Sequence, residues 1–412
     1  MVPEGWKKGD LGNLVDTVMG YAFKSKDFVE NGIQLLRMGN LYQNSLDLSR
    51  NPVFLPKSYK LEFDKYVVKP GDLVMSMTGT MGKRDYGFTV EIPLEAPDTL
   101  LNQRVIKLNP KKKTSSVFVI NLLQSEVVLA KLYSYPGGTK QANLSAKQIQ
   151  NLNVLIPPFP EQKKIAQILS TWDKAITTTE KLLKNSQQQK KSLMQQLLTG
   201  KKRLLDDNGV RFNGKWKKVN LENLCTVNPK KEPEPSNRMV SFISMDSVSE
   251  DARLKSFENK TYDVVSKGYT AFKDNDVILA KITPCFENGK GAYIYDLTNG
   301  VGFGSTEFHV LRAKKGISSR YIYYITCSYE FRTRGEANMQ GSAGQKRVTT
   351  DYIKALKVFL PALYEEQQAI SKVLSKADLE IDCLQQKIDY LKQEKKALMQ
   401  QLLTGKRRVR ID

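Results

Sequence analysis

The sequence has 412 residues, of which 40% are hydrophobic, and this is enough for two or three domains with sizeable cores. Lys and Arg number 64 against 43 Asp and Glu, which gives a formal net charge of +21. This excess favours a polyanionic partner, nucleic acid first and an anionic membrane surface second, over a soluble basic protein without one. The sequence shows neither a signal-peptide core nor an apolar run near the roughly 18 residues of a membrane span, so we expect a cytoplasmic protein without a membrane partner.

Residues 1–156 are predicted to form a first globular region. Short alternating apolar runs and Gly turns indicate a mixed α/β fold with much strand. Two polar, basic loops, residues 76–84 and 137–143, fit DNA recognition, because loop side chains can reach base edges while Lys and Arg bind phosphates. Amide side chains can pair with adenine and Arg with guanine, but each residue taken singly is equally well explained as a solvated turn residue. The candidates for DNA binding in this region are Thr78, Thr80, Lys83, Arg84, Lys140, Gln141 and Asn143.

Residues 157–200 are predicted to form a first long helix. Pro157 and Pro158 end the preceding strand-like run, the acidic Glu161 suits a helix N-terminus, and Gly200 suits a C-terminus. The periodic positions alternate in steps of four and three, as in a coiled-coil seam. The alternative, an ordinary buried core helix, does not explain a length of roughly 50 Å for about 35 residues. The seam positions are Ile165, Leu169, Trp172, Ile176, Thr179, Leu183, Ser186, Lys190, Leu193 and Leu197.

A linker over residues 201–218 leads into a second globular region, residues 219–360, that is weakly similar to the first. Trp6-Lys7-Lys8, for example, recurs as Trp216-Lys217-Lys218. Two further polar, basic loops, residues 281–290 and 341–347, fit DNA recognition in the same way. In this region the amides of Asn288 and Gln345 are candidates for adenine, and Arg347 for guanine. The full set of DNA-binding candidates here is Lys281, Thr283, Asn288, Lys290, Ser342, Gln345, Lys346 and Arg347.

Residues 361–405 are predicted to form a second long helix, followed by a basic tail over residues 406–412. Residues 190–201 recur almost unchanged as residues 395–406, differing only at Ser192 and Ala397, and chance does not explain such a match. The first copy has the more polar seam. The second seam runs through Ile370, Leu374, Ala377, Ile381, Leu384, Ile388, Leu391, Lys395, Leu398 and Leu402.

The repeat predicts an α+β architecture of two globular regions and two long antiparallel coiled-coil helices with a pseudo-twofold axis. The second globular region starts soon after the first helix and finishes where the second begins, so both helix ends must lie within one domain's width. Globular regions roughly 50 Å apart would meet a duplex about one and a half turns apart, because DNA advances about 34–36 Å per turn. The helices would then fix the length of an unrecognised spacer.

Two nearly identical helix surfaces also predict two equivalent docking sites for one partner. The alternative is that the identity records only recent duplication and the packing of one helix on the other. The docking candidates lie off the seam at Met194, Gln195, Met399 and Gln400.

The sequence predicts no catalytic residue and no metal ligand set. An amino-methyltransferase needs a Gly-rich turn and an Asn/Asp-Pro-Pro-Tyr/Phe loop, and Asn51-Pro52-Val53-Phe54 lacks the second proline. Residues 79–83 lack phosphate-loop spacing. His309 is the one histidine, and we interpret it as structural. The four cysteines lie too far apart for a zinc site or a disulfide framework, so we expect reduced, mostly structural thiols; they are Cys225, Cys285, Cys327 and Cys383.

The repeated helix ends, Leu-Met-Gln-Gln-Leu-Leu-Thr-Gly-Lys, and the Pro and Glu-Gln helix openings closely resemble the specificity subunits of type I restriction–modification systems. The resemblance covers essentially the whole chain, although the globular regions match only in outline. It implies two target recognition domains, each contacting half of a split double-stranded DNA target, and helices that dock two methyltransferase (modification) subunits. It also implies restriction (translocase) subunits. No cofactor is expected on this chain; S-adenosylmethionine would bind the methyltransferase, and ATP and Mg²⁺ the restriction subunit.

Three alternatives remain open at this point. A structural coiled-coil protein with incidental charge does not explain two diverged basic regions on nearly identical helices. A self-contained restriction–methylation enzyme would need methyl-donor and nuclease motifs, which the sequence does not show. A lone specificity-like chain could also act as an antitoxin or regulator.

Overall fold

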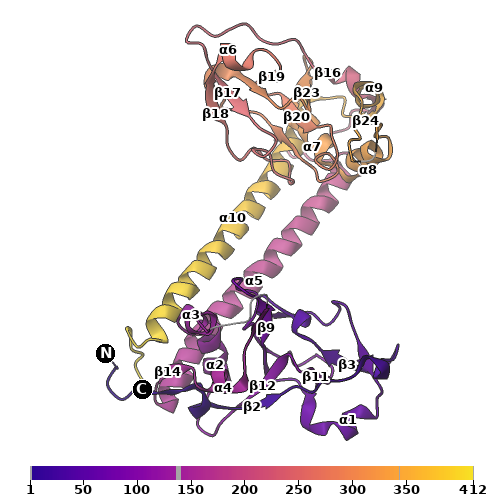
Figure 1. The fold of residues 1–412 in the computed structure, drawn as a ribbon. Helices are drawn as coiled ribbons and strands as arrows, with labels where there is room; N and C mark the ends of the chain where they lie inside the picture. Colours follow the sequence, from indigo (N-terminus) through magenta and orange to yellow (C-terminus); the bar gives the residue numbers. More distant parts are fainter. Residues whose placement is uncertain (1, 136–140, 343, 412) are drawn as a thin grey trace. The chain divides into compact units, whose positions relative to one another are not determined.

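The computed structural model describes residues 2–135, 141–342 and 344–411. By its internal contacts the chain divides into two compact units, which we call unit 1 (Met1–Glu180 with Gln386–Asp412) and unit 2 (Lys181–Gln385). Each unit therefore contains one globular region and part of each of two long helices, α5 and α10, which are labelled in Figure 1.

Two four-stranded sheets form most of the globular region of unit 1. One has the order β10-β8-β12-β2 and is antiparallel; the other has the order β6-β3-β11-β7, in which β3 and β11 are parallel. The pairs β1-β14, β13-β9 and β4-β5 are two-stranded. The strands are β1 (Lys7–Asp10), β2 (Val15–Met19), β3 (Ile33–Leu36), β4 (Leu41–Tyr42), β5 (Ser45–Leu46), β6 (Phe54–Leu55), β7 (Val67–Val68), β8 (Leu73–Ser76), β9 (Thr78–Thr80), β10 (Thr89–Glu91), β11 (Thr99–Leu101), β12 (Val105–Pro110), β13 (Gln141–Asn143) and β14 (Asn153–Ile156).

Unit 2 repeats the strand order and pairing of unit 1. Its sheets have the orders β21-β20-β23-β16, again antiparallel, and β18-β17-β22-β19, again with one parallel pair in the middle, β17 and β22. A two-stranded pair, β15-β24, corresponds to β1-β14. The globular regions are therefore diverged copies of one fold. The strands are β15 (Lys217–Asn220), β16 (Cys225–Val227), β17 (Met239–Ile243), β18 (Glu258–Thr261), β19 (Thr270–Lys273), β20 (Val277–Ala280), β21 (Gly291–Tyr293), β22 (Val301–Gly304), β23 (Phe308–Ala313) and β24 (Lys357–Leu360).

Short helices follow the same repeat. Ser115 and Ser318 are N-caps whose hydroxyl oxygens accept from the amide three residues on, which satisfies a free helix N–H. The α-helices are α1 (Tyr59–Glu62), α2 (Ser116–Leu123), α3 (Glu126–Tyr133), α4 (Ala146–Gln150), α6 (Tyr262–Val265), α7 (Ser319–Cys327), α8 (Tyr329–Ala337) and α9 (Thr350–Ala355). The 3-10 helices are η1 (Leu11–Asn13), η2 (Ser25–Asp27), η3 (Met38–Asn40), η4 (Asp64–Tyr66), η5 (Leu221–Asn223) and η6 (Thr298–Gly300).

The two long helices are α5 (Phe159–Leu197) and α10 (Tyr364–Leu402). Each is followed by a glycine in the left-handed region, Gly200 at φ +71° and Gly405 at φ +67°. In both copies the amide two residues after this glycine donates back to a helix carbonyl at 3.1 Å, as expected for a glycine-terminated helix. The predicted long helices and their glycine ends are confirmed.

The long helices lie antiparallel to each other within each unit. As residue numbers rise along α5, the numbers of the partners fall along α10, which confirms the predicted pairing. Lys190 and Lys395 occupy the seam, and each meets an Asp there. The side-chain contacts are Asp173 with Lys395 (2.6 Å) and Glu180 with Lys392 (2.7 Å) in unit 1, and Ser186 with Glu380 (2.9 Å) and Lys190 with Asp378 (2.5 Å) in unit 2.

Each unit takes part of its main core from the ends of the long helices. Met399, Leu402 and Leu403 belong to the core of unit 1, and Met194 and Leu197 occupy the corresponding place in unit 2. Met194 and Met399, two of the docking candidates, are each only 8% exposed, so their side chains pack mainly into the protein. Burial of these apolar side chains ties the helix ends to the sheets, whereas the neighbouring Gln195 and Gln400 are exposed.

The described residues contain neither a single membrane-spanning helix nor a metal-binding cluster of His, Cys, Asp or Glu. No single helix in them is long and apolar enough to cross a bilayer; only α2 and α3 together, bent by 55°, pass that test, and their Phe118 and Leu122 are buried in the core of unit 1. No group of three or more His, Cys, Asp or Glu side chains suited to a metal ion occurs in residues 2–135, 141–342 or 344–411.

Candidate nucleic-acid interface

In unit 1 the two loops singled out in the sequence lie side by side. β9 pairs with β13, with Thr78 opposite Asn143 and Thr80 opposite Gln141. The Thr78 hydroxyl donates to Asn143 Oδ1 at 2.8 Å, and Thr78 is only 4% exposed. Thr78 therefore positions Asn143 and is too buried to contact a base itself, which corrects its place among the candidates.

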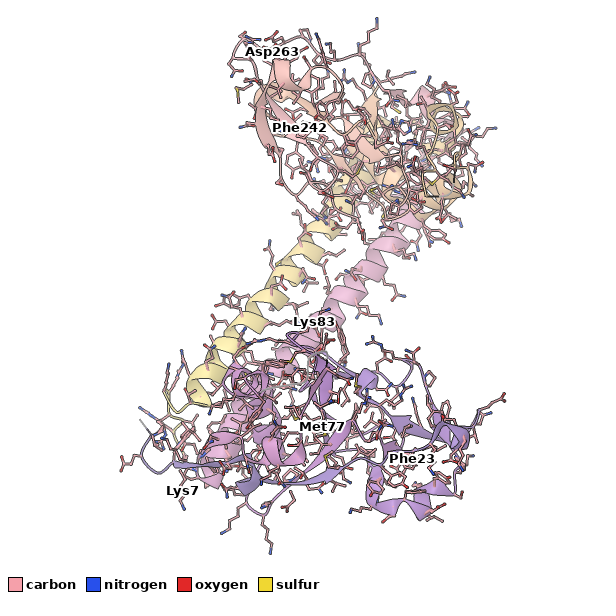
Figure 2. All side chains as sticks on the ribbon, viewed as in Figure 1. Lys7, Phe23, Met77, Lys83, Phe242 and Asp263 are labelled. Carbon is pink, nitrogen blue, oxygen red and sulfur yellow. The ribbon has the colours of Figure 1, made fainter. Side chains whose placement is uncertain are left out.

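The exposed part of this surface in unit 1 is polar. Thr80, Lys83, Gln141 and Asn143 are exposed. Figure 2 labels Met77, whose side chain is buried at the start of the loop, and Lys83, which is exposed further along it. Lys140 lies outside the described residues.

Arg84, the predicted guanine contact of unit 1, is already engaged within the unit. Its guanidinium lies 2.9 Å from Glu126 Oε2 and 5.1 Å from the centre of the Tyr133 ring. The ion pair and the Tyr133 ring orient Arg84, and 58% of its side chain remains exposed.

In unit 2 the two corresponding loops also come together. The Thr283 amide donates to the Lys346 carbonyl, and the Val348 amide donates to the Lys281 carbonyl, both at 2.9 Å. Ser342, Gln345 and Lys346 are exposed beside this junction, and Arg347 and Lys281 are half-buried. The sequence thus predicted two loops in each unit, and the fold pairs them in the same way in both.

Three other candidates in unit 2 make bonds inside the protein. The Thr283 hydroxyl donates to Glu287 Oε1 at 2.8 Å, and the Asn288 amide donates to Glu250 Oε1 at 2.9 Å. Lys290 Nζ donates to the Met245 carbonyl at 3.1 Å. These side chains stabilise the loop. The hydrogens that form these bonds are not available to DNA while the loop is intact.

Arg332, which no sequence pattern singles out, anchors the same loop. Its side chain donates to the carbonyl oxygens of Phe286 (3.1 Å), Gly289 (3.0 Å) and Thr326 (2.8 Å). Burial lowers the pKa of Arg332, but the three carbonyl acceptors compensate for the desolvated charge. The anchoring role of Arg332 depends on the packing of α8 against this loop, and the sequence alone does not show that packing.

His309 joins β23 to the end of the second loop of unit 2. The Val348 carbonyl can only accept, so His309 Nε2 carries the hydrogen and donates to it at 2.8 Å. Nδ1 then accepts from the Asn228 amide at 3.2 Å. The ring is 3% exposed, and burial lowers the pKa of His309, which keeps it neutral. This agrees with the interpretation of His309 as structural.

We expect His309 to give the protein a pH-dependent stability. Because the pKa is lower in the folded state than the ordinary 6.5, the contribution to stability is complete above about pH 6.5. It is lost as the pH falls, because the unfolded chain then takes up the proton more readily. Denaturation of unit 2 followed between about pH 7 and pH 5 should show this decline, and H309Q should weaken it. Equal pH dependence in both proteins would contradict the assignment.

A buried glutamate at the start of each long helix binds one Trp and one Arg, and we call these two sites the Glu clamps. Glu161 accepts from Trp6 Nε1 at 2.9 Å and from both Nε and Nη2 of Arg408, at 2.7 and 2.9 Å. Glu366 accepts from Trp216 Nε1 at 3.2 Å and from Arg203, at 2.5 and 2.8 Å.

The residues of the Glu clamps stand out in the sequence, but the contacts between them could not be predicted from it. The Glu-Gln helix openings and the two Trp-Lys-Lys segments are both visible as repeats, but in the sequence the acidic residue is explained by the helix dipole alone. The following glutamines also have a shared role: Gln162 and Gln367 accept from the amides of Ser115 (3.1 Å) and Ser318 (2.9 Å). These contacts fix each long helix to its globular region.

The predicted docking residues of unit 2 line a groove. Its volume is about 760 Å³, and Met194, Gln195 and Lys191 contribute to its walls together with Tyr329 and Phe331 of α8. Lys191 lies over the Tyr329 ring, 5.5 Å from its centre. The repeat-equivalent Lys396 of unit 1 instead meets Glu126 at 3.5 Å. The helix surfaces are nearly identical in sequence, but their surroundings differ.

This duplicated fold, with paired polar loops in each copy, matches a known family. The family model for the type I restriction modification DNA specificity domain matches twice, over residues 3–186 and 213–393, and the chain belongs to this family. The two matches correspond to the two copies of the fold described above.

Individual proteins support the same classification. The chain is 39% identical over 157 residues to the type I restriction enzyme EcoAI specificity subunit of Escherichia coli, a match that covers 38% of this chain and only 27% of that relative. It is 22% identical over 392 residues to the StySPI specificity subunit of Salmonella potsdam, which covers 90% and 82% of the two chains. The type I restriction–modification S subunit from M. genitalium has a similar fold, with a TM-score of 0.56 at 11% identity over 98% of this chain and 96% of that one.

Proposed function

We propose that this chain is the DNA-recognition subunit of a type I restriction–modification complex and that each unit contacts one half of a bipartite target. The observation that carries the proposal is the repeated loop pair. The same strand framework presents Gln141 and Asn143 in unit 1 and Gln345 and Arg347 in unit 2. Amide and guanidinium groups select different bases, so one framework would recognise two different sequences.

The net charge of +21 supports contact with DNA phosphates around these loops. Phosphate contacts fix the position of a protein on the duplex, and base contacts then give specificity. In this proposal the long helices set the length of the unrecognised spacer, so whole helical turns added to both helices would lengthen it.

The long helices also provide the docking sites for two methyltransferase subunits in this proposal. The groove beside Met194 and Gln195 supports one such site, because it combines apolar walls with exposed polar groups at a repeated helix end. Gln400 lies at the equivalent position in unit 1. The chain itself would be non-catalytic, with S-adenosylmethionine bound by the methyltransferase and with ATP and Mg²⁺ bound by an accompanying restriction subunit.

The test changes the loop residues of one unit at a time. The chain is co-expressed with its modification subunit, and methylated adenines are mapped across the host genome by sequencing. Gln345→Ala with Arg347→Ala should relax or abolish only one half of the target, because each base contact is local to its unit. The matched pair Gln141→Ala with Asn143→Ala should affect only the other half. If both pairs altered the same half, or if neither altered the target, the assignment of one half-target to each unit would be wrong.

A further inference from the structure

Arg347 is held by a carboxylate that the sequence did not single out. Glu307 accepts from Arg347 Nε and Nη2, both at 3.0 Å, and Arg347 Nη1 donates to the Gln345 carbonyl at 3.2 Å. The pair is partly open to solvent, with 42% of the Arg347 side chain and 25% of the Glu307 side chain exposed. The guanidinium is therefore oriented but accessible.

The geometry of this ion pair leaves one edge of the guanidinium free for a ligand. Glu307 occupies the side formed by Nε and Nη2, and the Gln345 carbonyl takes one hydrogen of Nη1, so Nη1 and Nη2 each keep one further hydrogen for a ligand. Nη1 and Nη2 together form the end of the guanidinium fork, which donates to O6 and N7 of guanine in the major groove. A side-on carboxylate thus fixes the plane of Arg347 without using its base-contacting edge.

We propose that Glu307 is a positioning residue that holds Arg347 to recognise a guanine in the half-target of unit 2. This inference rests on the proposed function and deepens it. The Arg347 guanidinium also lowers the pKa of Glu307, so this carboxylate stays ionised at neutral pH and the ion pair persists there.

The corresponding pair in unit 1 has different chemistry on the same backbone. The carbonyl of Glu307 accepts from the Lys281 amide at 2.9 Å, and the carbonyl of Arg104 accepts from the Met77 amide at 3.0 Å. Arg104 is therefore the counterpart of Glu307. By the same register, Asn143 is the counterpart of Arg347. Unit 1 presents an amide where unit 2 presents a supported guanidinium, so guanine recognition at this position belongs to unit 2 alone.

The rival explanation is that Arg347 only neutralises a phosphate or closes the loop. A lysine would serve the phosphate role almost as well, because it keeps the charge, but it lacks the planar fork. A loop-closing ion pair would affect folding and would leave base preference unchanged. Base preference is therefore the measurement that separates the inference from both rivals.

The experiment compares E307Q, R347K and R347A in the complete complex with the modification subunit. Mapping of methylated adenines gives the preference at every target position, and thermal unfolding is followed in parallel. We expect all three variants to lose discrimination at the same single guanine, by roughly 5- to 100-fold, the range for one bidentate base contact. E258Q, which breaks the exposed ion pair between Glu258 and Lys260, removes the same charge and should leave the target unchanged.

Each other result identifies what has failed. If R347A alters one position but E307Q does not, or if E307Q lowers only the unfolding temperature, Glu307 is not a positioning residue for recognition. If the altered base is not guanine, or if R347K keeps full discrimination, the guanine assignment fails. In these cases the proposed function stands, because one half-target still depends on unit 2. The proposed function itself fails if the double variants of both units leave the target unaltered or if both alter the same half.

Discussion

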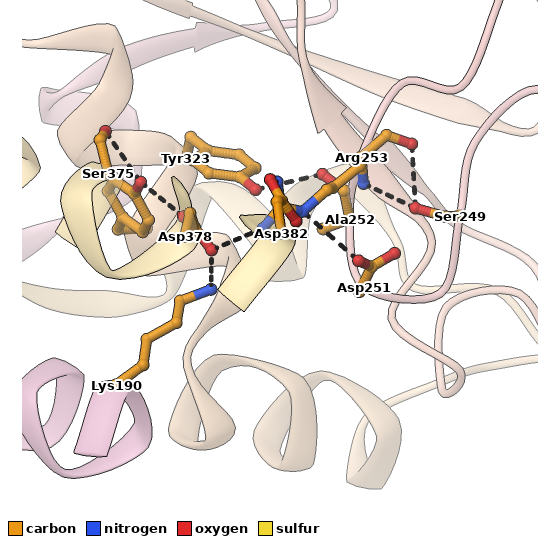
Figure 3. A network of polar contacts seen from close by, with 10 residues as sticks. Lys190, Ser249, Asp251, Ala252, Arg253, Tyr323, Ser375, Asp378 and Asp382 are labelled. Atoms are coloured by element: carbon orange, nitrogen blue, oxygen red, sulfur yellow. Dashed lines mark hydrogen bonds and ion pairs between the residues drawn. The ribbon is translucent and has the colours of Figure 1, made fainter. Parts of the chain in front are cut away.

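Replacing Asp378 with alanine is expected to destabilise unit 2 by about 2–4 kcal/mol. Asp378 is 11% exposed, and its carboxylate accepts from Lys190 (2.5 Å), Arg253 (2.9 Å) and Tyr324 (2.8 Å), as Figure 3 shows for part of this network. Asp382 forms a further ion pair with Arg253. Removal of the carboxylate would take the acceptor from the partly buried Lys190 ammonium and would leave the buried Tyr324 hydroxyl with only Ser375 as a partner. Native-state hydrogen exchange at the amides of α7 and α10 would report the loss in unit 2 itself.

The duplication supplies a matched control for this prediction. Asp173 holds the same place in the repeat and pairs with Lys395 at 2.6 Å, but its side chain is 50% exposed. Water screens such a pair, so Asp173→Ala should cost only about 0–1 kcal/mol in unit 1. Equal losses for the two variants would show that burial does not control the strength of these seam contacts.

Replacing Glu366 with alanine is expected to destabilise unit 2 by about 2–4 kcal/mol. The Glu366 side chain is 1% exposed and that of Arg203 is 21% exposed, so the variant would leave a charged group and the Trp216 indole N–H without their shared acceptor. The start of α10 would lose its link to the segment that follows α5. Hydrogen exchange should accelerate at the start of α10 and in β15, and Trp216 fluorescence should report the change in its surroundings.

The neighbouring Glu365 is exposed and provides the control, because Glu365→Ala removes the same charge from the same helix turn. It should have little effect on stability. Glu161→Ala should destabilise unit 1 in the same direction but less strongly, because the Arg408 side chain is 42% exposed and has less to lose from the missing partner. If E365A and E366A had equal effects, the Glu clamp would add nothing beyond its charge at the helix start.

The long helices could be predicted from the sequence because their determinants are local and repeated. Spacing in steps of four and three and a terminal glycine are each visible within a few residues, and Gly200 and Gly405 end their helices as expected. Lys190 and Lys395 could be placed in the seam by the same spacing. The DNA-binding loops could be named because polar, Gly-containing segments on a strand-rich scaffold are recognisable without knowing what they face.

The rest depends on contacts between residues far apart in the sequence. Periodicity along one helix does not show which other surface covers Met194 or Met399, and in fact both pack into the main cores of their units. Thr78 belongs to a candidate loop, but only strand pairing with β13 turns its hydroxyl toward Asn143. Arg84 and Arg347 were equivalent candidates in the sequence. The fold distinguishes them, because Glu126 and Tyr133 hold one and Glu307 holds the other.

Because unit 1 includes residues from both ends of the chain, the two units are completed at different times during translation. Its core includes Met399, Leu402 and Leu403, and its Glu clamp includes Arg408, whereas unit 2 is built entirely from residues 181–385. A ribosome translates all of unit 2 before it reaches the residues that complete unit 1. The region whose synthesis begins first is therefore the later of the two to become complete, and nascent unit 1 keeps part of its apolar surface uncovered while the second half of the chain is still emerging.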